Sequence, residues 1–232
     1  MRKYVSNFWP LYWIAAVVVV TVSLAASRAV TVLAESSPIS RENVIIIDAG
    51  HGGEDGGATS CTGILESQFN LEIALRLNDL MHLLGLETVM IRTTDISVYT
   101  QGNTIAAKKV SDLKERVRIV NETENALLIS IHQNMFSDSQ YYGAQVFYNG
   151  QSRSLAEQLQ ASLVGTLNPC SRRKSKSASG VYLMQHIQRP GLLVECGFIS
   201  NPEEEAKLRT GEYQKKLCCV IAATVSKNLS AT

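Results

Sequence analysis

Hydrophobic and polar residues follow two alternating patterns from residue 43 to residue 232. Short runs of branched apolar residues are typical of buried strands, and longer stretches with apolar residues every three or four positions are typical of amphipathic helices. The strands expected from the short runs are 44–47, 86–92, 126–134, 143–150, 180–186 and 191–198. The helices expected from the longer stretches are 66–84, 112–122, 152–167, 202–209 and 212–229. Because strands and helices follow one another along the chain, the pattern predicts an α/β fold, a single three-layer domain built around a six-stranded sheet.

The first 42 residues have a different pattern. Residues 8–26 are almost wholly apolar, and no charged side chain occurs between Lys3 and Arg28. A stretch of that length is close to the roughly 20 residues needed to cross a bilayer, whereas its small residues near the end would also suit a cleaved signal peptide. We therefore expect residues 1–27 to be a membrane anchor or a signal peptide, with the length favouring the anchor, and residues 28–42 to be a linker. Both interpretations export the domain at 43–232.

Composition excludes some classes of partner and site. The chain carries 22 Lys and Arg against 21 Asp and Glu, a formal net charge of +1. There is therefore no electrostatic reason to expect nucleic acid as a partner. The five cysteines show no Cys-x-x-Cys spacing, so neither a disulfide framework nor a cysteine metal site is expected.

Ionisable side chains stand at the carboxyl ends of three expected strands. His51 follows the first strand inside a glycine-rich loop, His132 lies near the end of another apolar run, and Glu195 follows three apolar residues. Glu66 opens the helix after the glycine loop. Because the carboxyl ends of strands in an open α/β sheet meet at one edge, we expect these four side chains to lie together. Two histidines and one carboxylate are the ligand set of a catalytic zinc site, and a second carboxylate can then transfer protons.

Each of these side chains also has a structural interpretation. Glu66 alone would suit the N-terminal end of a helix dipole, and His132 alone could be a hydrogen-bonded core histidine. Glu195 is harder to explain in this way, because an unpaired buried carboxylate is costly. The glycine loop lacks the Gly-Lys-Ser/Thr ending of a P-loop, so phosphate binding is not favoured. The two other histidines are interpreted as structural, His82 and His186.

Four segments together resemble successive motifs of one enzyme family, DAGHGGEDGGA, NLEIALRLNDLMHLLGLETVMIRTTD, LKERVRIVNETENALLISIHQN and PGLLVECGFISNPEE. In this order, over about residues 44–229, they are similar to the zinc-dependent N-acetylmuramoyl-L-alanine amidases, the type-3 peptidoglycan amidases. The resemblance implies a six-stranded mixed sheet flanked by helices, with Zn²⁺ as cofactor and peptidoglycan as partner. It also implies hydrolysis of the amide that joins N-acetylmuramic acid to the L-alanine of the stem peptide.

The resemblance assigns roles to individual residues. The family's metal ligands fall on three positions, His51, Glu66 and His132. Its catalytic glutamate falls on Glu195. Asp48 and Asn134 become candidates for orienting a ligand histidine or the substrate, because they are close to the ligands in sequence. Arg116 is a further candidate that could pair with an acidic group, although solvated surface is the simpler expectation for it.

Within the family, the chain is similar to the sporulation-associated subgroup, which acts on spore cortex precursor. It lacks wall-binding repeats, has a short segment after His132, and contains the sequence GVYLMQ. This similarity implies a role in cortex maturation, through formation of muramic δ-lactam, in the space between forespore and mother cell. An activating partner protein is not identified by the sequence.

Two local features depart from the family pattern or lie outside it. Gln133 follows the second histidine and Cys196 follows Glu195, and a thiol beside zinc would make the site sensitive to oxidation. The basic run 172–176 is a candidate contact for acidic stem peptides, although such runs are usually solvated loops.

Two alternatives to the amidase remain open from the sequence. The domain could be a regulator that binds muropeptides without cutting them, although the presence of Glu195 and of all three expected ligands argues against this. It could also be a zinc peptidase that cuts within the stem peptide. Mass analysis of released muropeptides would separate these functions.

Overall fold

The computed structural model describes residues 43–230 of the chain. The hydrophobic segment expected at 1–27 and the linker expected at 28–42 lie outside the described residues. Within residues 43–230, no helix is both long enough and apolar enough to cross a membrane.

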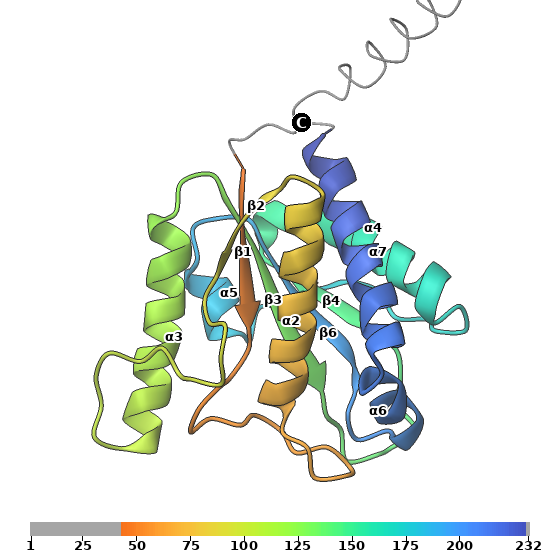
Figure 1. The fold of residues 1–232 in the computed structure, drawn as a ribbon, viewed down its shortest axis with the longest axis horizontal. Helices are drawn as coiled ribbons and strands as arrows, with labels where there is room; N and C mark the ends of the chain where they lie inside the picture. The colour runs from red at the N-terminus through yellow and green to blue at the C-terminus, as the bar shows by residue number, and fades with distance from the viewer. Residues whose placement is uncertain (1–42, 231–232) are drawn as a thin grey trace, which may run out of the picture. The chain divides into compact units, whose positions relative to one another are not determined.

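A six-stranded mixed sheet forms the middle layer of the domain, as the sequence predicts (Figure 1). Its strands lie in the order β2-β1-β3-β6-β4-β5. The first four are parallel, β4 is antiparallel to β6, and β5 is parallel to β4. The strands are β1 (Val44–Ala49), β2 (Glu87–Met90), β3 (Ala126–Asn134), β4 (Gln145–Tyr148), β5 (Lys176–Ser177) and β6 (Gly191–Phe198).

Helices cover both faces of this sheet. Helices α2 and α7 lie side by side against one face, with α4 packed on α7 and β4, and α3 and α5 cover the other face (Figure 1). A 3₁₀ turn, η1, precedes α4, and α6 packs on β6 and α7. The helices are α2 (Glu66–Leu83), α3 (Ile105–Glu122), η1 (Gly150–Ser152), α4 (Arg153–Leu167), α5 (Tyr182–His186), α6 (Pro202–Leu208) and α7 (Gly211–Leu229).

The alternation of side chains along the central strands decides which residues can reach the site. Ile46, Leu128 and Leu193 belong to the apolar cluster under α3 and α5. Side chains two residues apart on a strand point to the same face of the sheet, so every second residue after these three also faces α3 and α5. Asp48 on β1 and Glu195 on β6 therefore lie on the α3 and α5 face, together with His132 on β3.

One expected strand is wrong. Residues 180–186 were expected to form a strand, but Tyr182–His186 is the helix α5, with Ile187 N–H donating to the Leu183 carbonyl in the helical pattern. Leu183 and Met184 are neighbours in sequence and both are buried. Adjacent residues of a strand point to opposite faces, whereas one turn of a helix can bury both against the same surface. A short apolar run cannot be assigned by periodicity alone. The sixth strand is instead the two-residue β5, which the sequence did not indicate.

The helix expected from residue 112 begins earlier, at Ile105. The hydroxyl of Thr104 accepts a hydrogen bond from the N–H of Ala107 at 3.2 Å and caps the helix. A threonine at this position satisfies one of the free N–H groups of the first turn. The seven extra residues at its start include Lys109, which lines the candidate site together with Asp112 of the expected helix.

Candidate functional site

The side chains of His51, Glu66 and His132 meet at the carboxyl edge of the sheet. His51 lies just after β1, Glu66 is the first residue of α2, and His132 lies in β3. The Nε2 atom of His51 lies 3.2 Å from Oε2 of Glu66, and Nδ1 of His132 lies 2.9 Å from Oε1 of Glu66. One ligand atom from each residue falls within 4.8 Å of the others. The structure thus brings together the three residues that the sequence selects as metal ligands.

This set of donor atoms fits a Zn²⁺ ion. Zinc binds histidine nitrogen and carboxylate oxygen at about 2.0–2.2 Å in a tetrahedral arrangement, which puts neighbouring ligand atoms about 3.3 Å apart. The two histidine nitrogens lie 3.2 and 2.9 Å from the two oxygens of the same carboxylate, and one donor atom of each residue lies within 4.8 Å of the others, so the three side chains are close enough to share one ion. Three protein ligands leave the fourth position free for water or substrate, as in catalytic zinc sites.

The glycines around His51 allow this close approach. A Cβ atom on Gly50 would lie 2.2 Å from Nε2 of His132, and one on Gly57 would lie 2.6 Å from Oε2 of Glu66. His51 itself has φ 60°, a left-handed conformation that is uncommon for a residue with a side chain. Such a conformation persists only where surrounding contacts enforce it, and it is concentrated at functional sites.

Asp55 orients the first histidine. Its Oδ2 lies 2.9 Å from Nδ1 of His51, which leaves Nε2 of His51 directed at Glu66. Asp55 is itself held by Lys109 at 2.8 Å and by the N–H of Gly57 at 3.3 Å. A carboxylate on the far nitrogen of a ligand histidine fixes its tautomer and ring orientation. Asp55 is not among the candidates that the sequence motifs indicate, although an acidic residue four positions after a histidine in a tight glycine turn is a usable signal.

The charges in the cluster favour a deprotonated carboxylate between two imidazoles. Burial would lower the pKa of His51, but hydrogen bonding and charge from Glu66 and Asp55 outweigh it and raise the pKa to about 9. Burial would raise the pKa of Glu66, but hydrogen bonds and charge from His132 and His51 hold it well below its usual range. Glu66 is therefore a carboxylate at neutral pH, and binding of a cation would release a proton from His51.

Glu195 stands next to the three ligands. It is the register partner of His132 on the neighbouring strand β6. Its Oε2 is buried and has no hydrogen-bond partner among the described residues. Burial raises the pKa of Glu195 to about 7, despite the opposing charge of His132. A carboxylate with a pKa near neutrality is suited to accept and return a proton.

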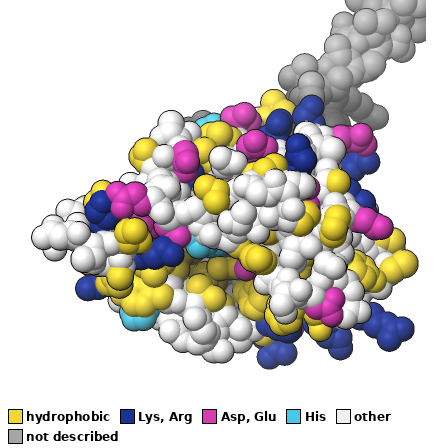
Figure 2. All heavy atoms as spheres, turned by 90° about the horizontal axis from the view of Figure 1, so that it is seen from below, with side chains coloured by type: hydrophobic (Ala, Val, Ile, Leu, Met, Phe, Trp, Pro, Cys, Tyr) yellow, Lys and Arg dark blue, Asp and Glu magenta, His cyan; other side chains and the backbone are white. Residues whose placement is uncertain are grey.

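His51, His132 and Glu195 line one cavity of about 360 Å³. Leu183 and Leu193 give it an apolar wall, so part of a substrate can be shielded from water there. Figure 2 looks onto the carboxyl edge of the sheet, where a hollow near the centre of the face shows histidine and hydrophobic side chains.

Arg116 has a different place from the one expected. It is only 2% exposed, so the expectation of solvated surface is wrong. It forms an ion pair with Asp48 and a second with Asp112, at 2.6 Å from Nε to Oδ2. It also donates to the carbonyl of His51 at 2.9 Å. Arg116 therefore ties helix α3 to the backbone of the loop that carries the first histidine.

Asp48 belongs to this support and not to the ligand shell. Its carboxylate accepts from Arg116 and, at 2.6 Å, from the hydroxyl of Ser130. Burial would raise the pKa of Asp48, but the Arg116 guanidinium and the Ser130 hydroxyl hold it below its usual range. No described histidine shares a hydrogen bond with it, so the orienting carboxylate is Asp55. Asn134 lies at the end of β3, where its carbonyl accepts from the N–H of Ile199 at 2.9 Å.

Two further supporting residues carry no signal in the sequence, Arg92 and Asn70. Arg92, 2% exposed, donates to the carbonyls of Ala49 at 2.8 Å and Gly50 at 3.1 Å. Asn70 on α2 donates to the same Gly50 carbonyl at 3.1 Å and to Oε1 of Glu66 at 3.3 Å. Nothing in the sequence marks either as special, because arginine and asparagine are usually exposed.

Cys196 follows Glu195 in sequence but does not share its face of the sheet, so the structure shows no exposed thiol beside Glu195. Adjacent strand residues point to opposite faces, and Cys196 is fully buried on the face opposite Glu195. Burial raises the pKa of its thiol well above the usual value, with a further contribution from Cys218 of α7. A buried neutral thiol is an inert core residue.

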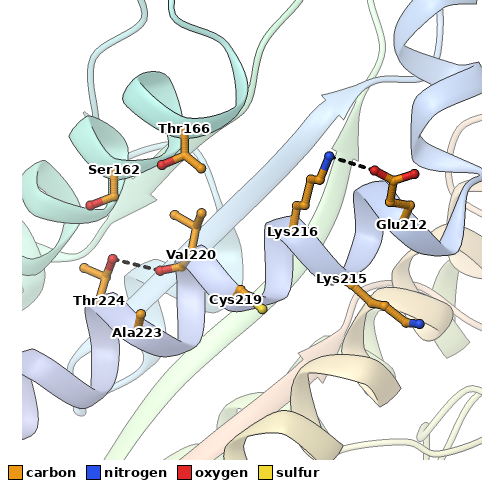
Figure 3. A pocket seen from close by; sticks show the side chains of 9 residues that line it. All are labelled: Ser162, Thr166, Glu212, Lys215, Lys216, Cys219, Val220, Ala223 and Thr224. Atoms are coloured by element: carbon orange, nitrogen blue, oxygen red, sulfur yellow. Dashed lines mark hydrogen bonds and ion pairs between the residues drawn. The ribbon is translucent and has the colours of Figure 1, made fainter.

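A second hollow, of about 540 Å³, lies between α4 and α7 (Figure 3). Its charged pair is Lys216 and Glu212, 2.8 Å apart on one helix, and Thr224 donates to the Val220 carbonyl at 2.8 Å. Figure 3 shows these side chains bonded along α7 and not gathered on a common point. Although this hollow is larger, the cavity at the sheet edge is the candidate site.

Comparison with known proteins identifies the family of this chain. Residues 45–227 match the family model for N-acetylmuramoyl-L-alanine amidase. Over 190 residues the chain is 37% identical to the germination-specific N-acetylmuramoyl-L-alanine amidase of Bacillus subtilis (strain 168), covering 80% of this chain and 79% of that protein. Among solved structures, the CwlD amidase of Clostridioides difficile in complex with the GerS lipoprotein superimposes with a TM-score of 0.78 at 34% identity, covering 82% of this chain and 100% of the other. An N-acetylmuramoyl-L-alanine amidase from Clostridium difficile 630 superimposes with a TM-score of 0.72 at 28% identity, over 83% of this chain and 100% of the other. The chain therefore belongs to the N-acetylmuramoyl-L-alanine amidases, the family that its sequence motifs resemble.

Proposed function

We propose that this amidase hydrolyses the bond between N-acetylmuramic acid and L-alanine in peptidoglycan with Zn²⁺ held by His51, Glu66 and His132. The observation that carries the proposal is the convergence of these three ligands beside Glu195, a buried carboxylate with a free oxygen. When bound, Zn²⁺ supplies Lewis acidity that polarises the scissile carbonyl and makes water a stronger acid.

The protein's own groups then move one proton. Glu195, which lines the cavity, accepts it from the attacking water at its carboxylate and returns it to the nitrogen of the departing L-alanine. Asp55 holds the tautomer of His51 while this happens. Arg116 and Arg92 hold the loop backbone, so the ligand geometry is formed before substrate arrives.

Product analysis tests this proposal. The purified full chain in detergent is stripped of metal, incubated with peptidoglycan with or without added zinc, and the products are identified by mass spectrometry. We expect free stem peptides that begin with L-alanine, formed only when zinc is present. Fragments cut within the stem would contradict the amidase in favour of a zinc peptidase, and intact glycopeptide with zinc bound would favour a muropeptide-binding regulator.

We propose further that the enzyme acts on spore cortex. Its similarity to the germination-specific amidase of Bacillus subtilis supports this role, through exposure of muramic acid for later conversion to muramic δ-lactam. Muropeptide analysis of spores from a strain that lacks the protein should then show little or no δ-lactam. Normal δ-lactam content would contradict the role and leave the amidase activity standing.

The same proposal places the enzyme outside the cytoplasmic membrane, in the forespore and mother-cell intermembrane space, attached through residues 1–27 or released from them. The similar Clostridioides difficile amidase was solved with a lipoprotein, which supports an extracytoplasmic activating partner for this chain. Detection of the protein in the membrane fraction of sporulating cells, and loss of that signal when residues 1–27 are exchanged for a cleaved signal peptide, would test the anchor.

A further inference from the structure

A basic groove lies beside the candidate site, on the side of β4 and β5. It has a volume of about 840 Å³, larger than the cavity that holds Glu195. Four basic side chains come from the segment that leads into β5 and from β5 itself. The residues that line it are Gln140, Tyr141, Tyr142, Gln145, Cys170, Ser171, Arg172, Arg173, Lys174 and Lys176.

The groove starts one strand away from Glu195. Gln145 on β4 is the register partner of Glu195 on β6, and directly opposed residues of antiparallel strands lie on the same face of a sheet. Gln145 is 3% exposed, and its amide donates to the carbonyl of Lys174 at 2.8 Å. Its carbonyl oxygen accepts from Nη1 of Arg173 at 2.9 Å. The basic segment is therefore held in a defined position relative to Glu195.

The charge of the groove is not compensated. Arg172, Lys174 and Lys176 are exposed, and none of them forms an ion pair with a carboxylate of residues 43–230. Every lining residue in the described part of the chain is basic or neutral. By contrast, the exposed Lys216 is paired with Glu212 at 2.8 Å. Uncompensated cations around a concave surface raise the local concentration of anions.

Arg173 and its neighbours form the wall of the groove. Its guanidinium lies 4.3 Å from the ring centroid of Phe198, and its Nε donates to the carbonyl of Tyr142 at 2.7 Å. The buried Glu204 lies near Arg173, but it accepts the N–H groups of Gly143 and Phe198. The hydrogen bonds of Glu204 are therefore made to backbone N–H groups and not to the guanidinium of Arg173.

We propose that the basic groove binds the carboxylates of the stem peptide while the scissile amide lies at Glu195. The inference rests on the proposed function, because that function places an acidic peptide at Glu195. The peptide runs away from the scissile bond on its L-alanine side, and the basic groove offers it cationic partners beyond β4, in β5 and the segment that leads into it. Arg172, Lys174 and Lys176 contact the carboxylates, and Tyr141 and Tyr142 present exposed rings to the peptide between them.

The test uses a triple variant of the full chain with zinc, Arg172→Gln, Lys174→Gln and Lys176→Gln. Arg173 is kept, because its contacts with Tyr142 and Gln145 belong to the fold. A matched control removes three exposed cations that do not line the groove, Arg209→Gln, Lys215→Gln and Lys227→Gln, so that the net charge falls equally. The substrates are two soluble muropeptides that differ only in the stem, one with free side-chain and terminal carboxylates and one with these carboxylates converted to amides.

We expect the triple variant to raise KM for the acidic muropeptide about tenfold, with kcat within about twofold, because exposed charge pairs contribute modestly and act on binding. The same variant should leave KM for the amidated muropeptide nearly unchanged, and the difference should shrink at high salt. Equal losses on the two substrates, or an equal loss in the control variant, would overturn the proposal.

A binding measurement separates this inference from the amidase itself. Calorimetric titration of the free acidic stem tripeptide into the protein requires no cleavage, and the triple variant should weaken it about tenfold. If the wild type cleaves peptidoglycan but does not bind the tripeptide, the proposed role of the groove is wrong and the proposed amidase activity still holds. Tripeptide binding to the groove without any cleavage would overturn the amidase. Binding of polyglycerol phosphate in preference to the tripeptide would assign the groove to a wall polyanion and overturn the stem-peptide proposal.

Discussion

The cavity at the sheet edge and the hollow between α4 and α7 differ in a way that size does not reveal. The hollow is larger, about 540 Å³ against about 360 Å³. In the hollow, Lys216 pairs with Glu212 and Thr224 donates to the Val220 carbonyl along α7. In the cavity, two of the three clustered ligand residues, His51 and His132, lie with Glu195, whose Oε2 has no hydrogen-bond partner among the described residues. Unsatisfied and convergent groups, more than volume, identify a site that can do chemistry.

The largest effects are expected at the cavity, where the metal ligand His132 and the proton carrier Glu195 should respond differently to substitution. We expect His132→Ala to lose zinc and activity together, because it removes one of three ligands. Glu195→Gln should keep zinc and lower kcat by about 10²- to 10⁴-fold, the range for loss of a general acid–base group. Metal analysis of the purified variants and muropeptide release measure both effects. Zinc loss in Glu195→Gln would show that Glu195 is a ligand and not the proton carrier.

The next effect concerns the support beneath the cavity. Arg116→Met leaves Asp48 buried without its partner, and breaking a buried pair in this way costs about 3–5 kcal/mol in the free energy of unfolding. Urea unfolding measures the loss. Arg118→Met on the same helix removes an exposed arginine and should change the free energy of unfolding far less. Equal losses of unfolding free energy in the two variants would mean that the buried Arg116–Asp48 pair stabilises the fold no more than an exposed arginine does.

This loss should depend on pH in one direction. The pKa of Asp48 is held below its ordinary value of 3.8 in the folded protein, so its contribution is present above that value and disappears as the pH falls through the folded pKa. The difference in unfolding free energy between wild type and Arg116→Met should therefore narrow in acid. A difference that widens below about pH 4 would contradict the assigned ion pair.

Glu195 should destabilise the metal-free protein at alkaline pH. Because burial raises its pKa to about 7, the wild type loses unfolding free energy as the pH rises from the unfolded value to the folded one. Glu195→Gln cannot ionise, so without metal it should be more stable than the wild type by about 2–3 kcal/mol at pH 8 and by little at pH 4. A pH-independent difference would show that the Glu195 carboxylate is solvated.

The glycine loop gives a smaller effect with an internal control. Gly57→Ala puts a methyl group against Glu66 at a φ of +69°, so we expect a loss of about 1–3 kcal/mol in unfolding free energy and about tenfold or more in zinc affinity. Gly165→Ala lies in α4 with open space around it, and should raise the unfolding free energy by about 0.5–1 kcal/mol. Unchanged zinc affinity in Gly57→Ala would contradict the close approach.

The smallest effect is expected in the hollow. The double variant Cys219→Ser and Ala223→Ser makes its exposed surface more polar without filling it. Activity should stay within about twofold and the unfolding free energy within about 0.5 kcal/mol. A tenfold loss of activity would show that the hollow takes part in catalysis and would remove the comparison with the cavity.

Much of the fold was predictable because its signals are local. The buried runs that form β1, β3 and β6 and the helical stripes of α2 and α7 each show their period within one segment. The run at 180–186 was assigned wrongly because it is short, and its helical form depends on burial of Leu183 and Met184 under the sheet. The two-residue β5 has almost no pattern of its own and exists through its pairing with β4.

The sequence by itself placed His51, His132 and Glu195 at one edge of the sheet, because they close apolar strands whose ends must meet there. The family resemblance, and not the spacing, assigned Glu66 as the third ligand. Only the tertiary structure decided what supports them. Asp55, and not Asp48, orients His51, and Arg116 and Arg92 are buried to hold the loop. These contacts join residues from separate elements, and whether a charged side chain is solvated or buried depends on which elements pack over it. That information is absent from any single stretch of the chain.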